Sequence, residues 1–140
     1  MRKEISAGII LFNEQEGRKF LLLNYPSGHW DFVKGKMEEG ETYQTTALRE
    51  TKEETGISDV EFLDGFKEEI EYKFRIEGEE IQKKVVFFLG KTTVTNVTIS
   101  HEHLDFIWLD FDKALEKTTY DNAKNLLKKS KIFLDNWILN

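Results

Sequence analysis

The sequence of 140 residues has no cysteine and a single proline, Pro26. The lack of cysteine excludes disulfide bonds, thiolate catalysis and zinc sites built on cysteine. No apolar run approaches the ~20 residues that a membrane-spanning helix needs. The first residues, Met1-Arg2-Lys3-Glu4, lack the apolar core of a signal peptide. We therefore expect a cytoplasmic protein without a membrane-bound segment.

Cations are fewer than acids, with 20 Lys and Arg residues against 26 Asp and Glu residues, which gives a net charge of −6. Proteins that coat nucleic acid depend on clustered cations, so no stable nucleic-acid partner is expected. A nucleotide bridged by a divalent metal remains compatible with this charge. The length suits one domain over residues 1–140 with a core of its own. No long apolar face is left over for a partner, so we expect a monomer.

Apolar stretches alternate with polar turns along the chain, and a turn is indicated at 24–28, around the proline. This order of elements predicts a mixed β-sheet with helices packed against it. The expected elements are strands over 6–12 and 19–23 around a loop at 13–18, a helix over 41–55, strands within 58–95 around a hairpin tip at 77–79, a strand over 105–109, and a helix from 121 onward.

The predicted helix over 41–55 has Glu41 in its first turn and Gly56 as its C-cap. Glu50, Glu53 and Glu54 follow the i, i+3, i+4 spacing, so their carboxylates share one face and repel one another. They also lie near the helix C-terminus, where the helix dipole disfavours negative charge. Arg49 relieves only part of this repulsion.

A further cation is therefore needed beside the three acids, and a hard divalent ion that also binds phosphate is the natural candidate. The alternative interpretation is an acidic, solvated helix face, which is the usual meaning of such a run of charges.

The segment from Gly35 to Ile57 resembles the Nudix box, G-x5-E-x7-R-E-U-x-E-E-x-G-U, in which U is a bulky apolar residue. The one departure is Thr51, whose methyl group can still pack inward. The resemblance implies the Nudix fold, an α+β protein whose mixed sheet lies between helices as an α/β/α sandwich. It also implies hydrolysis of a nucleoside diphosphate linked to another group. The matching positions are Gly35, Glu41, Arg49, Glu50, Glu53, Glu54, Gly56 and Ile57.

Further segments resemble the asymmetrical diadenosine tetraphosphate hydrolases within that family. The resemblance implies a Mg²⁺-dependent attack of water on phosphorus that yields ATP and AMP. Other substrates stay open, namely the 5′-triphosphate end of RNA, oxidised nucleoside triphosphates and ADP-ribose. A nucleotide sensor with negligible turnover, and a structural domain with an accidental box, are alternatives of a different class. The segments are His29-Trp30 before Lys34-Gly35, the box with its Thr51, residues 65–72, and Ser100-His101-Glu102-His103 before Trp108-Leu109.

The resemblance also implies a metal site. Glu50, Glu53 and Glu54 would hold Mg²⁺, with Mn²⁺ as a substitute, helped by the backbone carbonyl of Gly35. Glu53 and Glu50 are both candidates for the general base, and Glu102 would face the metal as a further ligand or alternative base. Glu41 and Arg49 are interpreted as a structural ion pair instead of catalytic groups.

A zinc site at His101-Glu102-His103 is an alternative for the later segment. It lacks both the helical spacing of paired histidines and a third ligand nearby.

A nucleotide substrate implies contacts to phosphates and to a base. His29, Lys34, Lys36 and one of the pair Lys83 and Lys84 are the candidate phosphate contacts, although a lone lysine is usually a solvated surface residue. Tyr72 and Tyr120 match positions where aromatic rings enclose adenine, and stacking of this kind tolerates different bases. Otherwise these tyrosines are half-buried core residues. Trp30, Trp108 and Trp137 are assigned to the core.

Overall fold

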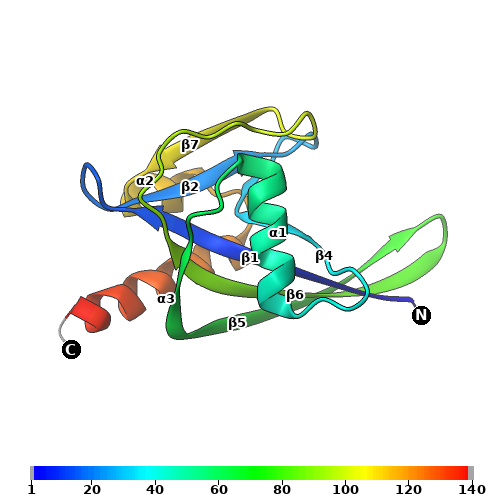
Figure 1. Cartoon of the computed structure of the whole chain (residues 1–140). Helices are drawn as coiled ribbons and strands as arrows, with labels where there is room; N and C mark the ends of the chain where they lie inside the picture. Colours follow the sequence, from blue (N-terminus) through cyan, green and yellow to red (C-terminus); the bar gives the residue numbers. More distant parts are fainter. Residues whose placement is uncertain (1, 139–140) are drawn as a thin grey trace.

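The structure is a computed structural model that describes residues 2–138, with only the backbone of Ile138. Within this range the chain forms seven strands and three helices (Figure 1). They are β1 (Arg2–Asn13), β2 (Lys19–Asn24), β3 (Trp30–Asp31), β4 (Val33–Lys36), α1 (Tyr43–Thr55), β5 (Glu61–Ile76), β6 (Glu79–Lys91), β7 (Asp105–Leu109), α2 (Phe111–Lys117) and α3 (Asp121–Ile138).

The strands form one mixed sheet in the order β3-β2-β1-β6-β5, with β4 also paired to β1 and β7 to β2. Its central pair is parallel and joins β1 to β6 from Arg2 opposite Ile81 to Phe12 opposite Lys91. The remaining pairs are antiparallel. Helix α1 lies on one side of this sheet, and α2 and α3 lie on the other (Figure 1). The predicted α/β/α sandwich is confirmed.

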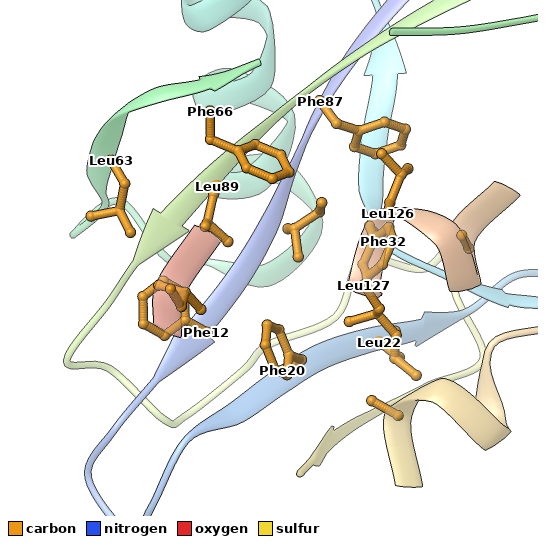
Figure 2. Packing of buried hydrophobic residues seen from close by; sticks show 14 of the residues in the cluster. Phe12, Phe20, Leu22, Phe32, Leu63, Phe66, Phe87, Leu89, Leu126 and Leu127 are labelled. Atoms are coloured by element: carbon orange, nitrogen blue, oxygen red, sulfur yellow. The ribbon is translucent and has the colours of Figure 1, made fainter. Parts of the chain in front are cut away.

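Each face of the sheet has its own apolar core because side chains alternate along a strand. On β1, Ile10 and Phe12 point toward α3, whereas Ile9 and Leu11 point toward α1. Figure 2 shows the core beneath α3, where Leu126 and Leu127 of that helix pack near the phenylalanines of the sheet. Burial on both faces explains why the central strands are continuous apolar runs.

Helix α1 begins two residues later than predicted. Thr42 is its N-cap and accepts a hydrogen bond from the backbone N–H of Thr45, and the Thr45 hydroxyl accepts one from the Thr42 N–H in return. Glu41 therefore lies in the loop before the helix, and its placement in the first turn was wrong. The C-cap is confirmed, because Gly56 has the left-handed φ of 77° that a helix end favours.

Other predictions were incomplete. Strand β1 starts four residues before the predicted 6–12, because 2–5 pair with β6 although they are mostly polar. The short strands β3 and β4 and the helix α2 were not predicted.

Trp30 and Trp108 pack partly buried against the two cores. Trp137 was wrongly assigned to the core, because its ring is 45% exposed and stacks on Phe133.

The C-terminal apolar pattern is confirmed at Leu126, Leu127 and Leu134, which are buried. The side chain of Ile138, which belongs to the same pattern, lies outside the described residues. None of the helices described between residues 2 and 138 is long and apolar enough to cross a membrane.

Candidate active site

The three acids of α1 differ in burial although they share one face of the helix. Their side chains are 14% exposed for Glu50, 58% for Glu53 and 8% for Glu54. Thr51 between them points into the protein, where its hydroxyl donates to the carbonyl of Ala47 at 2.8 Å. This bond satisfies the hydroxyl, so threonine is accommodated where the Nudix box usually has an apolar residue.

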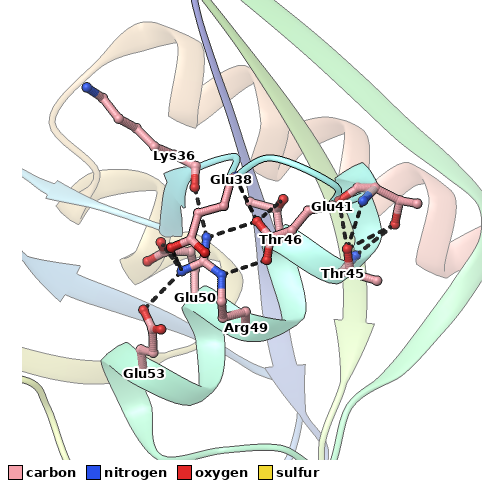
Figure 3. A network of polar contacts seen from close by, with 9 residues as sticks. Lys36, Glu38, Glu41, Thr45, Thr46, Arg49, Glu50 and Glu53 are labelled. Carbon is pink, nitrogen blue, oxygen red and sulfur yellow. Dashed lines mark hydrogen bonds and ion pairs between the residues drawn. The ribbon is translucent and has the colours of Figure 1, made fainter.

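Arg49 connects the helix to the loop before it through several carboxylates (Figure 3). Its Nε donates to Glu41 Oε2 at 2.7 Å, and its Nη1 donates to Glu50 at 2.9 Å and to Glu53 at 3.1 Å. Its Nη2 donates to the backbone carbonyl of Lys36, at the end of β4. The predicted ion pair between Glu41 and Arg49 is confirmed. The Arg49 hydrogen bond lowers the pKa of Glu41 to about 2.

Glu54 has the opposite surroundings. Its Oε2 is buried without a hydrogen-bond partner among residues 2–138, and its Oε1 lies 3.7 Å from His103 Nε2. Burial raises the pKa of Glu54 to about 9, and the negative charges of Glu50 and Glu102 add to that shift. This carboxyl group is therefore the member of the cluster that most lacks a cation.

The loop before β7 brings Glu102 to the acids of α1. Two backbone N–H groups of this loop donate to the end of α1, from Thr98 to the carbonyl of Thr55 and from Ser100 to that of Glu54. The charge of Glu102 raises the pKa of both Glu50 and Glu54, so Glu102 lies close enough to act on the cluster electrostatically.

His103 was not predicted as a site residue. It is buried between the Ser100 hydroxyl, 3.1 Å from Nδ1, and Glu54. Its ring also packs edge-on against Tyr25. In the sequence His103 belonged to a segment of the family resemblance and to the alternative zinc interpretation, but neither gave it a role of its own beside α1.

The acids meet the backbone of β4 at Gly35. A methyl group in place of the Gly35 hydrogen would collide with the Glu50 carboxylate, so only glycine allows this approach. Carboxylate and carbonyl oxygens are the donors that a hard divalent cation prefers. The unpaired Oε2 of Glu54 and the close approach of Gly35 to Glu50 therefore fit such an ion.

The described residues do not form a finished metal site. Across residues 2–138 no three His, Asp or Glu side chains converge at metal-ligand spacing. The Arg49 guanidinium is instead the cation that contacts Glu50 and Glu53. A metal held by these two acids would compete with Arg49 Nη1 for their oxygens.

A cavity of about 710 Å³ opens on the α3 side of the sheet. Most of the predicted substrate contacts line it. Lys84 does not, because its Nζ lies 3.3 Å from the Tyr43 hydroxyl of α1 and 3.4 Å from Glu69 on the other face of the sheet. Of the two adjacent lysines, Lys83 is therefore the one at the cavity. The predicted residues in its wall are His29, Lys34, Gly35, Lys36, Tyr72, Lys83 and Tyr120.

An aromatic stack forms one wall of the cavity. The His29 ring lies parallel to that of Tyr25, with centroids 4.7 Å apart, and the Tyr120 ring is tilted against His29 with centroids 5.3 Å apart. Burial lowers the pKa of His29. The Tyr25 hydroxyl donates to the carbonyl of Phe32, and burial raises its pKa. Tyr25 was not predicted, and its only sequence signal was its place in the turn before Pro26.

Tyr120 is held in place by the residue before it. The backbone N–H of Trp30 donates to the Thr119 hydroxyl at 2.9 Å, and the Thr119 N–H donates to the Trp30 carbonyl at 3.3 Å. These two bonds join β3 to the start of α3. Because Tyr120 follows directly, they fix its backbone beside His29.

A family model described as the NUDIX domain matches residues 2–129. The chain is 36% identical over 122 residues to the asymmetrical bis(5′-nucleosyl)-tetraphosphatase of Mus musculus, covering 83% of this chain and 80% of that protein. It is 32% identical over 133 residues to the Caenorhabditis elegans protein of the same name, covering 92% and 95%. The solved structure of a C. elegans Ap4A hydrolase in a binary complex aligns with a TM-score of 0.85 and 31% identity, covering 95% of this chain and 98% of that one.

Proposed function

Because this chain belongs to the Nudix family of hydrolases, we propose that it cleaves dinucleoside polyphosphates, and diadenosine tetraphosphate in particular, into ATP and AMP. One observation carries the proposal. Gly35 lines the basic, aromatic cavity and also lies against the Glu50 carboxylate. A phosphate chain in the cavity would therefore reach the acids of α1 at this strand.

The cavity residues divide by chemistry. His29 and the lysines Lys34 and Lys83 supply hydrogen-bond donors and positive charge for the phosphates. Lys34 is itself oriented by Asp31, whose carboxylate lies 3.2 Å from its Nζ. Tyr72 and Tyr120 supply rings for stacking on a base, at about 1–3 kcal/mol per base. The name of the relatives in Mus musculus and Caenorhabditis elegans, bis(5′-nucleosyl)-tetraphosphatase, includes both a nucleoside and a phosphate chain, which agrees with this division.

Mg²⁺, with Mn²⁺ as a substitute, would be held by Glu50, Glu53, Glu54 and the Gly35 carbonyl, and when bound it neutralises phosphate charge and acidifies water. Phosphoryl transfer depends mainly on positioning and charge stabilisation. Glu53 is the most exposed of the three acids and Glu50 lies nearest to β4, so each is suited to take the proton of the attacking water. Glu102 lies close to the same cluster and is an alternative base.

The products test the asymmetry of the reaction. The full chain is incubated with diadenosine tetraphosphate in ¹⁸O-water, with Mg²⁺, with Mn²⁺ or with EDTA, and the products are identified by mass spectrometry. We expect ATP and AMP in equal amounts, one of them carrying ¹⁸O, and no reaction in EDTA. Formation of ADP alone would contradict asymmetric cleavage, and full activity in EDTA would contradict the metal site.

A substrate panel separates this proposal from its alternatives. ADP-ribose, 5′-triphosphorylated RNA and oxidised dGTP are assayed under the same conditions. Faster turnover of one of these would replace the proposed substrate while retaining the hydrolase chemistry. Calorimetric binding of diadenosine tetraphosphate without hydrolysis over hours in Mg²⁺ would instead indicate a sensor. The single domain, the monomeric state and the cytoplasmic location remain predictions from the sequence.

A further inference from the structure

Ser6 is a buried polar residue that the Nudix box does not include. It lies on β1, is 1% exposed, and lines the cavity. Its hydroxyl has no hydrogen-bond partner among residues 2–138. A buried hydroxyl without a partner costs folding free energy, so such groups call for an explanation. Its position in the cavity wall suggests that the missing partner is a bound molecule.

The neighbours of Ser6 in the sheet define what that molecule can be. Ser6 is directly opposite Lys36 of β4 and Val85 of β6, and Lys83 lies two residues before Val85. Both lysines line the cavity together with Ser6. A hydroxyl that shares a cavity wall with two lysines is placed to bind an anionic group.

The charges around Ser6 are not balanced. Lys34 pairs with Asp31 at 3.2 Å and Lys36 pairs with Glu4 at 3.3 Å. Within the part of the chain that the structure describes, Lys83 has no carboxylate within 4.0 Å, and burial lowers its pKa. Of these three lysines, Lys83 is therefore the one that lacks a close counterion among the described residues.

We propose that Ser6 is a substrate-binding residue whose hydroxyl donates a hydrogen bond to a phosphate oxygen of the nucleotide, on the phosphate group that Lys83 neutralises. The inference rests on the proposed function and deepens it. Among residues 2–138, the Ser6 hydroxyl has no hydrogen-bond partner and the Lys83 ammonium has no carboxylate within 4.0 Å, and both side chains line the cavity. One phosphate group satisfies both, because it offers several acceptor oxygens and a negative charge.

The test compares the full chain with its Ser6→Ala variant by calorimetric or NMR titration in EDTA, where turnover is absent. ATP is the probe that carries phosphates, and adenosine is the probe without them. We expect the affinity for ATP to fall about tenfold, because a hydrogen bond to a charged group is lost. The affinity for adenosine is expected to stay the same.

Thermal stability without ligand gives a second readout. Alanine removes the unpaired hydroxyl and keeps the rest of the side chain, so the Tm of Ser6→Ala should equal or exceed that of the wild type. Ser130 is a matched control, because it is also buried but its hydroxyl donates to the Leu126 carbonyl at 2.8 Å. Ser130→Ala should lower the Tm and leave ATP binding unchanged.

Several outcomes would overturn the inference. Unchanged ATP affinity in Ser6→Ala would mean that solvent satisfies the hydroxyl, and a lower Tm for that variant would indicate a structural role. An equal loss for adenosine and ATP would assign the hydroxyl to the ribose or the base instead. Failure of the wild type to bind ATP both in EDTA and in Mg²⁺ would contradict the proposed function itself, whereas the other results contradict only the role of Ser6.

Discussion

Glu41 and Glu54 lie at opposite ends of the segment that carries α1, and their surroundings shift their pKa values in opposite directions. Glu41 accepts two hydrogen bonds from Arg49 and one from the backbone N–H of Glu38, and its pKa falls to about 2. Glu54 is buried beside other acids, and its pKa rises to about 9. The negative charge of a glutamate is thus compensated by hydrogen bonds and a cation at Glu41, and it is left uncompensated at Glu54.

This difference separates a structural role from a functional one. The Arg49 network joins the loop, β4 and α1 with charges that the chain supplies itself (Figure 3). At the Glu54 end, no Lys or Arg side chain of residues 2–138 pairs with the buried carboxyl group. Of the two ends, only this one leaves an acid uncompensated, and such places are where function is expected.

The largest expected effect is on turnover. Glu53 accepts a hydrogen bond from Arg49, but its side chain is mostly exposed. We therefore expect its replacement to affect catalysis more than the stability of the fold. Glu53→Gln should reduce kcat with diadenosine tetraphosphate by ~10²–10⁴-fold if it is the general base, while the Tm stays within about 2 °C. Stopped assays and thermal melts measure both values.

Glu38→Gln is the matched control for this variant, since Glu38 is another exposed acid near Arg49, at 3.7 Å. It should leave kcat unchanged. If Glu53→Gln kept full turnover, the role of base would pass to Glu50 or Glu102.

The next effect is a pair of stability changes with opposite signs, measured as Tm in EDTA. The lowered pKa of Glu41 stabilises the fold above its ordinary value of 4.5, and this contribution is lost as the pH falls from there to about 2. The raised pKa of Glu54 destabilises the fold increasingly as the pH rises from 4.5 to about 9. At pH 8, Glu41→Gln should therefore lower the Tm and Glu54→Gln should raise it, each by roughly 2–5 °C.

The pH dependence sharpens this result. The Tm difference between wild type and Glu54→Gln should vanish below pH 4.5, and that for Glu41→Gln should vanish near pH 2. Adding Mg²⁺ should stabilise the wild type more than Glu54→Gln. If both variants changed the Tm in the same direction at pH 8, the proposed difference between Glu41 and Glu54 would be wrong.

The smallest expected effect lies across the sheet, outside both ends of α1. Thr119→Val keeps the shape of the side chain but removes the hydroxyl that holds the Trp30 N–H. Tyr120 should then be less well positioned, which raises KM by about 3–10-fold, in keeping with the loss of one hydrogen bond, and leaves kcat unchanged. Thr119→Ser should restore KM. A fall in kcat at constant KM would show that Thr119 does not act through substrate binding.

Elements with strong local patterns could be predicted from the sequence, and those made by pairing could not. The apolar runs of β2 and β7 matched within one residue. The strand β4 has the sequence Val-Lys-Gly-Lys, whose only apolar residue is Val33, and it forms because it pairs with residues 6–9 of β1. The first four residues of β1 are likewise extended by β6, which is distant in the sequence.

The candidate site shows the same division. The acids of α1 share one face because helical spacing requires it. The choice between Lys83 and Lys84 needed the structure. Because β6 is apolar on both faces, the sequence does not show which of these two lysines faces the cavity. Glu102 and His103 lie beside α1 because backbone bonds from Thr98 and Ser100 attach their loop to the end of that helix, a contact that the sequence does not reveal. Ser6 had no sequence signal, because its significance lies in the lack of a partner.

The parallel pairing of β1 with β6 has a consequence for how the protein is made. Residues 2–12 find their central partner only in residues 81–91, so the sheet cannot close until most of the chain has left the ribosome. Until then the edge of β1 that pairs with β6 is exposed, and an exposed strand edge with apolar side chains is prone to aggregate. Contacts of such long sequence separation also slow folding. Shielding of β1 before β6 is available should therefore improve the yield of folded protein.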